Sequence, residues 1–215
     1  MESSAFSKHE PIRTQRLLLR AARQSDLVPF HQLFSDEDVM RYWYPPPHPL
    51  QHIKHPKLME NHRSCAPHTT ILQTSKSLRQ MLASPTNGSL DFVLVLTSPS
   101  SPTNPTSPPD TVIGRAGIWS VENSEIGFML KRECWAKGYM AEAFTALLGP
   151  EGVLWKRGVE RVVADVDPRN GGSMGILRRF GFVEVGRAER TFETHLGWCD
   201  SVYLELRNSG VKMES

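Results

Sequence analysis

Short apolar runs occur along the first part of the chain, and their periods predict its first elements. Residues 16–20 (Arg-Leu-Leu-Leu-Arg) form an apolar run with charged ends, which predicts a strand. Apolar side chains at helical spacing over 27–34 predict a helix, and the Ser-Asp pair at 25–26 can cap it. A shorter helical turn is expected over 36–42. The chain therefore opens with a strand and two helical segments.

The middle of the chain combines a predicted hairpin with irregular sequence. Residues 74–83 have helical spacing, and the run over 92–96 indicates a buried strand whose hairpin partner is expected over 111–119. Between the two strands, residues 97–109 consist only of Thr, Ser, Pro and Asn and have no apolar surface to bury. We expect a disordered loop insertion there, because closure entropy grows only logarithmically with loop length.

The pattern becomes regular after residue 110. Apolar side chains alternate over 125–130, with Ile126 and Phe128 on the face opposite Glu125. The remaining predicted elements are a helix over 141–148, a strand over 159–166, a helix over 174–180, a strand that begins at 181–183 and a final strand over 202–206. This order indicates an α+β fold built around one mixed sheet.

Length and charge narrow the class of protein. The chain has 215 residues, of which 25 are Lys or Arg and 23 are Asp or Glu, for a net charge of +2. This near balance argues against a nucleic-acid or membrane-surface platform, and no run approaches the roughly 20 apolar residues of a membrane span. Three scattered cysteines argue against a disulfide framework. We expect one domain over 1–215, cytoplasmic or nuclear, without nucleic-acid or membrane partners.

The segment 125–142 carries the clearest chemistry. A strand runs into a short loop that contains Gly138, and a helix begins just beyond it. Free N–H groups and the positive dipole end make a helix start an anion site, to which Lys137 adds a full charge. The segment has neither the Gly-Lys-Ser/Thr of a P-loop nor a G-x-G-x-x-G fingerprint. By itself the junction is weak evidence, since most such junctions bind no ligand.

Four segments, in this order, match motifs of one known superfamily. They are 14–20 (Thr-Gln-Arg-Leu-Leu-Leu-Arg), 38–43 (Asp-Val-Met-Arg-Tyr-Trp), 135–143 (Trp-Ala-Lys-Gly-Tyr-Met-Ala-Glu-Ala) and 167–182, with Asp-Pro-Arg-Asn at its start and Leu-Arg-Arg-Phe-Gly-Phe at its end. Together they resemble the GNAT superfamily of N-acetyltransferases, in particular its branch of ribosomal-protein N-terminal acetyltransferases. An unrelated phosphate-binding α/β protein would need these matches to be accidental.

The resemblance implies a fold and a cofactor site. The fold would be a single mixed, mostly antiparallel twisted sheet flanked by helices, and acetyl-CoA would be the co-substrate, without a metal. The loop would hold the CoA pyrophosphate on the amides of Trp135, Ala136, Lys137, Gly138, Tyr139 and Met140. The thioester would lie between the strands over 125–130 and 159–167, with Asn170 and Ser173 near its sulfur. Because Ala136 stands where the family usually has glycine, it must keep a negative φ or accept strain.

The catalytic roles that the resemblance implies leave alternatives open. Glu125 is the candidate general base, acting through water, and the alternative is an acid paired with a neighbouring arginine. Ser173 either donates to the departing sulfur or caps a helix. Phe180 replaces a tyrosine that serves some relatives as the acid, and Tyr203 is the back-up candidate. Cys134 lies next to the loop, but no histidine partner for nucleophilic catalysis is evident.

The acceptor side has less pattern. Of 16 prolines, 12 lie between Pro45 and Pro109. We interpret residues 45–85 as a variable substrate-side segment; its histidines and Cys65 do not predict zinc, because prolines interrupt any helix there. Together with the C-terminal hairpin this segment would shape the acceptor pocket. The predicted reaction is direct attack of a primary amine, of a protein N-terminus or a small molecule, on acetyl-CoA by a monomer or homodimer. The alternative is a non-catalytic acyl-CoA sensor or peptide-binding module.

Overall fold

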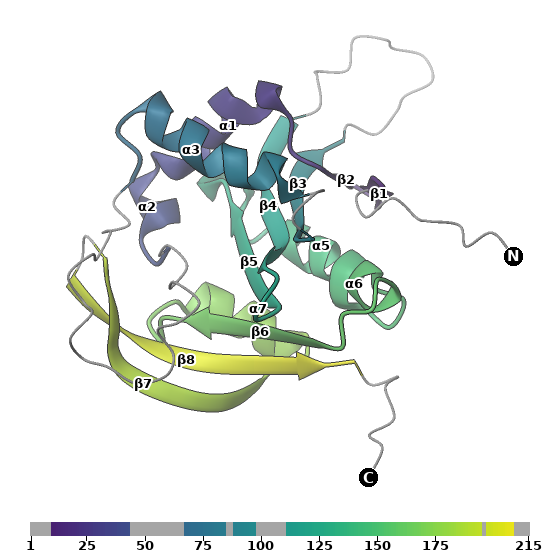
Figure 1. The fold of residues 1–215 in the computed structure, drawn as a ribbon, viewed down its shortest axis with the longest axis vertical. Helices are drawn as coiled ribbons and strands as arrows, with labels where there is room; N and C mark the ends of the chain where they lie inside the picture. Colours follow the sequence, from purple (N-terminus) through teal and green to yellow (C-terminus); the bar gives the residue numbers. More distant parts are fainter. Residues whose placement is uncertain (1–9, 44–66, 85–87, 98–110, 195–196, 209–215) are drawn as a thin grey trace, which may run out of the picture.

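One eight-stranded sheet organises the computed structural model, which describes residues 10–43, 67–84, 88–97, 111–194 and 197–208 (Figure 1). The strand order is β1-β2-β3-β4-β5-β6-β8-β7. The strands are β1 (Ile12–Arg13), β2 (Leu17–Arg20), β3 (Leu90–Leu96), β4 (Thr111–Ser120), β5 (Glu125–Leu130), β6 (Arg161–Val166), β7 (Val183–Thr194) and β8 (Gly197–Arg207). The helices are α1 (Leu27–Phe34), α2 (Glu37–Met40), α3 (Ile71–Leu82), α5 (Tyr139–Leu148), α6 (Val153–Lys156) and α7 (Gly171–Arg179), with 3-10 turns η1 (Gln24–Asp26) and η2 (Arg132–Cys134).

Strand pairing is antiparallel throughout this sheet except between β5 and β6. The predicted hairpin is present, because β3 pairs with β4 in antiparallel register. A mixed, mostly antiparallel sheet with helices on both sides is therefore confirmed.

The sheet opens between β5 and β6. These two parallel strands share a single register pair, Glu125 with Val163, next to a hydrogen bond from the Val163 N–H to the Ser124 carbonyl (3.1 Å). By contrast, β4 and β5 pair along the whole of β5. Figure 1 shows β5 and β6 running in clearly different directions. Because the contact lies at the start of β5, the opening widens toward the carboxyl ends of both strands.

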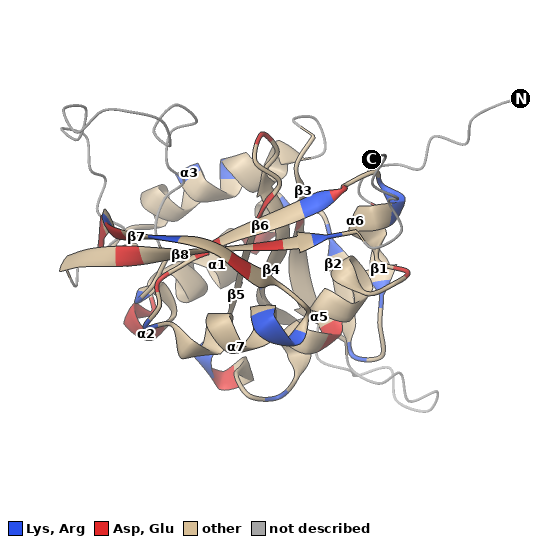
Figure 2. Cartoon of the chain, turned by 90° about the horizontal axis from the view of Figure 1, so that it is seen from below, with Lys and Arg blue, Asp and Glu red and all other residues tan. Residues whose placement is uncertain are grey.

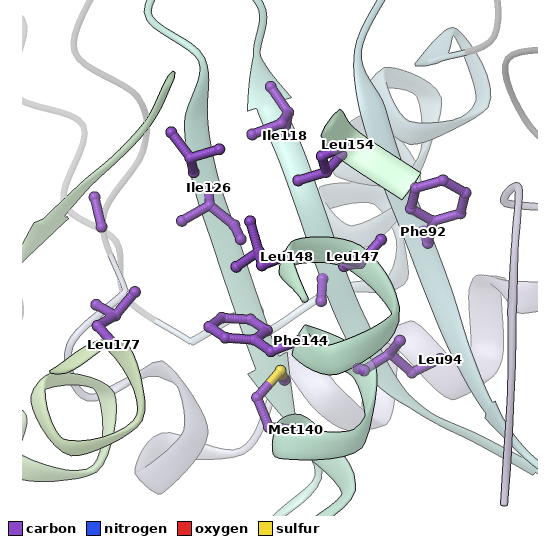
Figure 3. Close-up of a cluster of buried hydrophobic side chains, with 14 of the residues drawn as sticks. Phe92, Leu94, Ile118, Ile126, Met140, Phe144, Leu147, Leu148, Leu154 and Leu177 are labelled. Carbon is purple, nitrogen blue, oxygen red and sulfur yellow. The ribbon is translucent and has the colours of Figure 1, made fainter. Parts of the chain in front are cut away.

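Two apolar clusters cover the two faces of the sheet. On one face, α5 packs its buried side chains on β3, β4 and β5 and α7 contributes Leu177; Figure 3 shows Leu148 of α5 beside Ile126 of β5. On the other face, α1 and α3 enclose a second cluster that includes Met129. Ile126 and Met129 thus point to opposite faces, as the alternation over 125–130 predicts.

Local signals explain where helices begin. The helix α3 starts at Ile71, earlier than the predicted 74, because Thr70 and Gln73 form a reciprocal capping box that the apolar pattern does not reveal. Asp36 accepts N–H hydrogen bonds from Asp38 and Val39 and caps the expected helical turn α2. None of the helices in the described ranges is long and apolar enough to cross a membrane.

Aspartate 26 occupies the N-cap position of α1 but does not cap that helix through its side chain. Its carboxylate instead accepts two hydrogen bonds from the buried guanidinium of Arg20 (2.8 and 2.7 Å) and one from the Arg23 N–H (2.7 Å). The predicted helix is present, but its expected side-chain cap is replaced by a buried ion pair.

Parts of two predicted segments lie outside the described residues. All of the predicted insertion 97–109 except Thr97 lies there, as do 45–66 and residue 85 of the predicted substrate-side segment. The described remainder of that segment contains α3, whose Leu78 and Met81 are buried in the second cluster.

Candidate active site

The loop between β5 and α5 is held in an unusual backbone shape. Trp135 is 44% exposed, and its indole N–H donates to the Leu130 carbonyl at the end of β5 (2.8 Å). Two loop residues are left-handed, Ala136 with φ of 57° and Gly138 with φ of 79°. The sequence left two outcomes for Ala136, and the structure shows the strained one. A left-handed alanine costs roughly 1–2 kcal/mol, so the surrounding contacts must enforce this shape.

The helix start that follows this loop is suited to an anion. Gly138 is the N-cap of α5, and none of the described side chains caps the helix there. The first helical hydrogen bond runs from the Glu142 N–H to the Gly138 carbonyl (3.0 Å), which leaves the earlier N–H groups of the turn without helical acceptors. Lys137 is exposed beside them. The donor set therefore fits the pyrophosphate of acetyl-CoA.

A second helix start lies on the other side of the opening. Asn170 caps α7, because its side-chain oxygen accepts the Ser173 N–H (3.1 Å). The predicted alternative for Ser173, a helix cap, is therefore wrong; Ser173 is the third residue of α7 and is half-buried. Since β5 and β6 are parallel, the helices that follow them begin at the same edge of the sheet. Both helix starts consequently flank the opening.

Glu125 lies at the narrow end of the opening. It is 7% exposed, and burial, with a smaller contribution from the charge of Asp165, raises its pKa from 4.5 to about 8. No ion pair within the described ranges includes Glu125, so the alternative of an arginine-paired acid finds no support there. A carboxyl group with a pKa near neutrality is suited to proton transfer.

Asp165 and Tyr203 extend this acidic site on the neighbouring strands. Asp165 pairs with Tyr203 across β6 and β8, two residues beyond Val163, which faces Glu125. Burial raises the pKa of the Tyr203 hydroxyl, and the charges of Asp165 and Glu125 raise it further. Sequence reasoning missed Asp165, although its alternation with the buried Val166 places it on the face opposite the α5 core.

Gly127 makes room for two indoles on the same sheet face as Glu125. A side chain there would meet Cδ1 of Trp119 at 2.8 Å and Cη2 of Trp43 at 3.2 Å. The guanidinium of Arg115 lies 5.4 Å from the Trp43 ring and is ion-paired with the buried Asp91. These aromatic rings border the site from β4 and from the segment after α2. Sequence reasoning did not single out Gly127, because a lone strand glycine gives no indication of what lies against it.

Other candidates are not part of this site. Phe180 stacks edge-to-face on Phe144 in the core (5.3 Å between centroids), where an apolar ring suffices. Cys134 is buried, and burial raises its pKa, which disfavours the reactive thiolate. Of the histidine and cysteine cluster, only His68 lies within the described residues, where its Nδ1 is 3.0 Å from the Thr74 hydroxyl. The described residues contain no His, Cys, Asp or Glu group placed to hold a metal ion.

Charge is mixed on the side of the molecule shown in Figure 2, where acidic and basic positions are interspersed over β6, β7 and β8. Two ion pairs of this region are Arg187 with Glu184 (2.5 Å) and Arg207 with Glu205 (2.6 Å). The mixture of positive and negative charges on these strands thus agrees with the near-zero net charge of the whole chain.

Comparisons with solved structures identify the same fold. A ribosomal-protein-S5-alanine acetyltransferase from Vibrio fischeri is 18% identical, with a TM-score of 0.66 over 94% of this chain and 99% of that one. A spermidine N-acetyltransferase from Vibrio cholerae, in complex with CoA and spermine, is 16% identical, with a TM-score of 0.64 over 91% and 98%. The microcin C7 self-immunity acetyltransferase, in complex with acetyl-CoA and AMP, is 14% identical, with a TM-score of 0.63 over 90% and 93%.

A family model decides the assignment. A search of the curated proteins found no significant match. The model of the acetyltransferase (GNAT) domain matches residues 16–183, which include β2, the loop after β5 and α7. The enzymes of this fold use acetyl-CoA as co-substrate, and the open sheet with an uncapped helix start fits that molecule. The chain is a member of the GNAT acetyltransferase family.

Proposed function

We propose that this protein transfers the acetyl group of acetyl-CoA to a primary amine, of a protein N-terminus or a small molecule, by direct attack. The observation that carries the proposal is the opening between β5 and β6, with two helix starts at its wide edge and the buried Glu125 at its narrow end. The scattered cysteines favour a reducing compartment, so we place the reaction in the cytoplasm.

The wide edge would hold the acetyl donor. Backbone N–H groups of the loop Trp135–Met140 would bind the pyrophosphate, with the charge of Lys137 beside them. The cap uses only the side-chain oxygen of Asn170, so its NH2 group is the part that would reach the pantetheine arm. The Ser173 hydroxyl, one turn into α7, would donate toward the sulfur. Bound in this way, acetyl-CoA supplies the activated acetyl group.

The residues at the narrow end would accept the proton of the amine and return one to the thiolate. Glu125 would accept a proton from the attacking amine through water, and the amine nitrogen would bond to the thioester carbon as the carbon–sulfur bond breaks. Ser173 or Tyr203 would return a proton to the departing thiolate. Cys134 is buried next to the loop and would not act as a nucleophile. The acetyl group would therefore pass directly to the amine, without a covalent enzyme intermediate.

The pKa of Glu125 favours some acceptors over others. A terminal α-ammonium has a pKa near 8 and a lysine ammonium near 10.4. Because the pKa of Glu125 is about 8, proton transfer from an α-ammonium is nearly balanced, whereas transfer from lysine is uphill by a factor on the order of 100. We therefore favour protein N-termini and weakly basic small amines as acceptors.

The test compares Glu125→Gln with a matched control, Glu122→Gln, in the exposed turn just before β5. CoA release would be followed with a panel of N-terminal peptides, polyamines and small amines. Glu125→Gln should lower kcat by roughly 10²–10³-fold with acetyl-CoA KM little changed, whereas Glu122→Gln should change neither by more than about twofold. If acetyl-CoA binds but no amine releases CoA, the non-catalytic alternative replaces this proposal.

A further inference from the structure

Arg16, on the segment that leads into β2, makes three different contacts with the loop Trp135–Met140 and the first turn of α5. Its Nε donates to Glu142 of α5 (2.6 Å), its Nη1 donates to the Lys137 carbonyl (3.0 Å), and its guanidinium lies 4.5 Å from the centre of the Tyr139 ring. The Arg16 N–H also donates to Glu142 (2.7 Å). One side chain thus contacts the loop, the first residue of α5 and the first-turn acid.

The contact with the Lys137 carbonyl fixes the direction of a backbone donor. In a planar trans peptide the carbonyl and the following N–H point in opposite directions. Because Arg16 binds the carbonyl of Lys137, the N–H of Gly138 in the same peptide group must point away from Arg16. A left-handed glycine is the residue most free to flip such a peptide, so an external contact is needed to keep its orientation.

The contact between Arg16 and Glu142 neutralises a negative charge close to the proposed diphosphate site. A carboxylate in the first turn of α5 lies near the place proposed for a diphosphate and would repel it. Burial alone would raise the pKa of Glu142, but hydrogen bonds from Thr14 and Arg16 and the charge of Arg16 hold that pKa below its usual value, so the acid stays ionised. Arg16 supplies the compensating positive charge at 2.6 Å.

We propose that Arg16 and Glu142 form a clamp that sets the pyrophosphate loop in its binding shape before acetyl-CoA arrives. The clamp rests on the proposed role of the loop Trp135–Met140. Arg16 is a positioning residue in this scheme, because it acts through the Lys137–Gly138 peptide and through Glu142. The affinity gained is specific to the diphosphate part of the donor. A simple anchor of the strand β2 onto α5 would lack that specificity.

The experiment compares Arg16→Met with wild type on three acetyl donors: acetyl-CoA, acetyl-dephospho-CoA, which lacks the 3′-phosphate, and S-acetylpantetheine, which lacks the diphosphate and nucleoside. Arg16→Met should raise KM about tenfold for acetyl-CoA and acetyl-dephospho-CoA while kcat stays within about twofold. For S-acetylpantetheine, kcat/KM should stay within about twofold of wild type. The control Lys156→Met removes the cation of an exposed ion pair on α6 and should change none of these values.

Other results of the donor comparison would overturn either the clamp or the proposed cofactor contacts. Equal losses with all three donors would make Arg16 only a structural anchor and overturn the clamp. A loss confined to acetyl-CoA would mean direct contact with the 3′-phosphate, which also overturns it. If Arg16→Met does not fold, Arg16→Lys takes its place, because lysine keeps the charge but cannot bind Glu142 and the Lys137 carbonyl together. This variant should raise the KM values for acetyl-CoA and for acetyl-dephospho-CoA about threefold. If the wild type uses S-acetylpantetheine as well as acetyl-CoA, the loop is not a diphosphate site and the proposed cofactor contacts fail instead.

Discussion

The start of β5 and the first turn of α5, the helix that follows it, each carry an acid, and the two acids are in opposite situations. At its start, Glu125 is buried without an ion pair among the described residues, and its pKa is raised to about 8. Beyond its end, Glu142 accepts hydrogen bonds from the Thr14 hydroxyl and from the backbone and side chain of Arg16, and its pKa is lowered. The surroundings of Glu125 bring its pKa close to the working pH, whereas the partners of Glu142 keep that acid ionised.

The difference separates two tasks, proton exchange at the start of β5 and support of a loop at the start of α5. An acid that holds a loop in place works best when every partner is satisfied, because its charge must not change. An acid that exchanges protons works best when its two protonation states are close in free energy at the working pH. A buried, poorly paired carboxyl group gives up stability to reach that balance.

The largest expected effect on stability tests the start of β5. The raised pKa of Glu125 means that the folded state holds a proton that the unfolded state has already lost between pH 4.5 and about 8. Stability is therefore lost as the pH rises through that window, and Glu125→Gln removes this loss. The advantage of the variant in free energy of unfolding should grow by about 4–5 kcal/mol between about pH 4 and about pH 9.

Urea denaturation at both pH values measures this difference, with Glu122→Gln as the control. A difference that is the same at low and high pH would show that Glu125 titrates at an ordinary pKa, and the contrast with Glu142 would disappear.

A second variant tests the loop at the start of α5. Gly138→Ala places a side chain at φ of 79°, which should lower the free energy of unfolding by about 1–2 kcal/mol and raise the KM for acetyl-CoA several-fold. Thermal unfolding and steady-state kinetics would report the two effects. Gly158→Ala is a suitable control, since Gly158 is equally left-handed (φ of 82°), has open space around it and is remote from the loop. The control should lose similar stability without the change in KM.

The smallest effect concerns Ala136. Replacement by glycine relieves the left-handed strain but adds freedom to the unfolded chain, so the net gain in stability should be about 0.5 kcal/mol. Differential scanning calorimetry resolves a gain of this size as a rise in Tm of about 1–2 °C. A fall in Tm would mean that the Ala136 methyl group makes a packing contact worth more than the strain.

The local sequence pattern was enough to predict the strand and the helix that form the site. The alternation over 125–130 predicted both faces of β5, and the Gly138 junction predicted the start of α5 within a few residues. Such features depend on neighbours two to four positions apart, which the sequence displays directly.

Partnerships between distant residues could not be predicted in the same way. The charged ends of the run over 16–20 suggested a strand boundary, but nothing in the sequence indicated that Arg16 binds Glu142. The alternatives for Ala136 and Glu125 likewise depended on what the fold placed around them. Sequence reasoning thus identified the loop but not the contacts that hold its shape.

The separation between Arg16 and Glu142, 126 positions along the chain, has a consequence for folding. Contacts between such distant residues form only after much of the chain has been ordered, because loop closure must come first. We therefore expect the loop to take its final shape late, when β2 has joined the sheet. Acetyl-CoA, which would bind only the completed loop, should act as a folding ligand: at a hundred times its Kd it would stabilise the native state by about 2.7 kcal/mol.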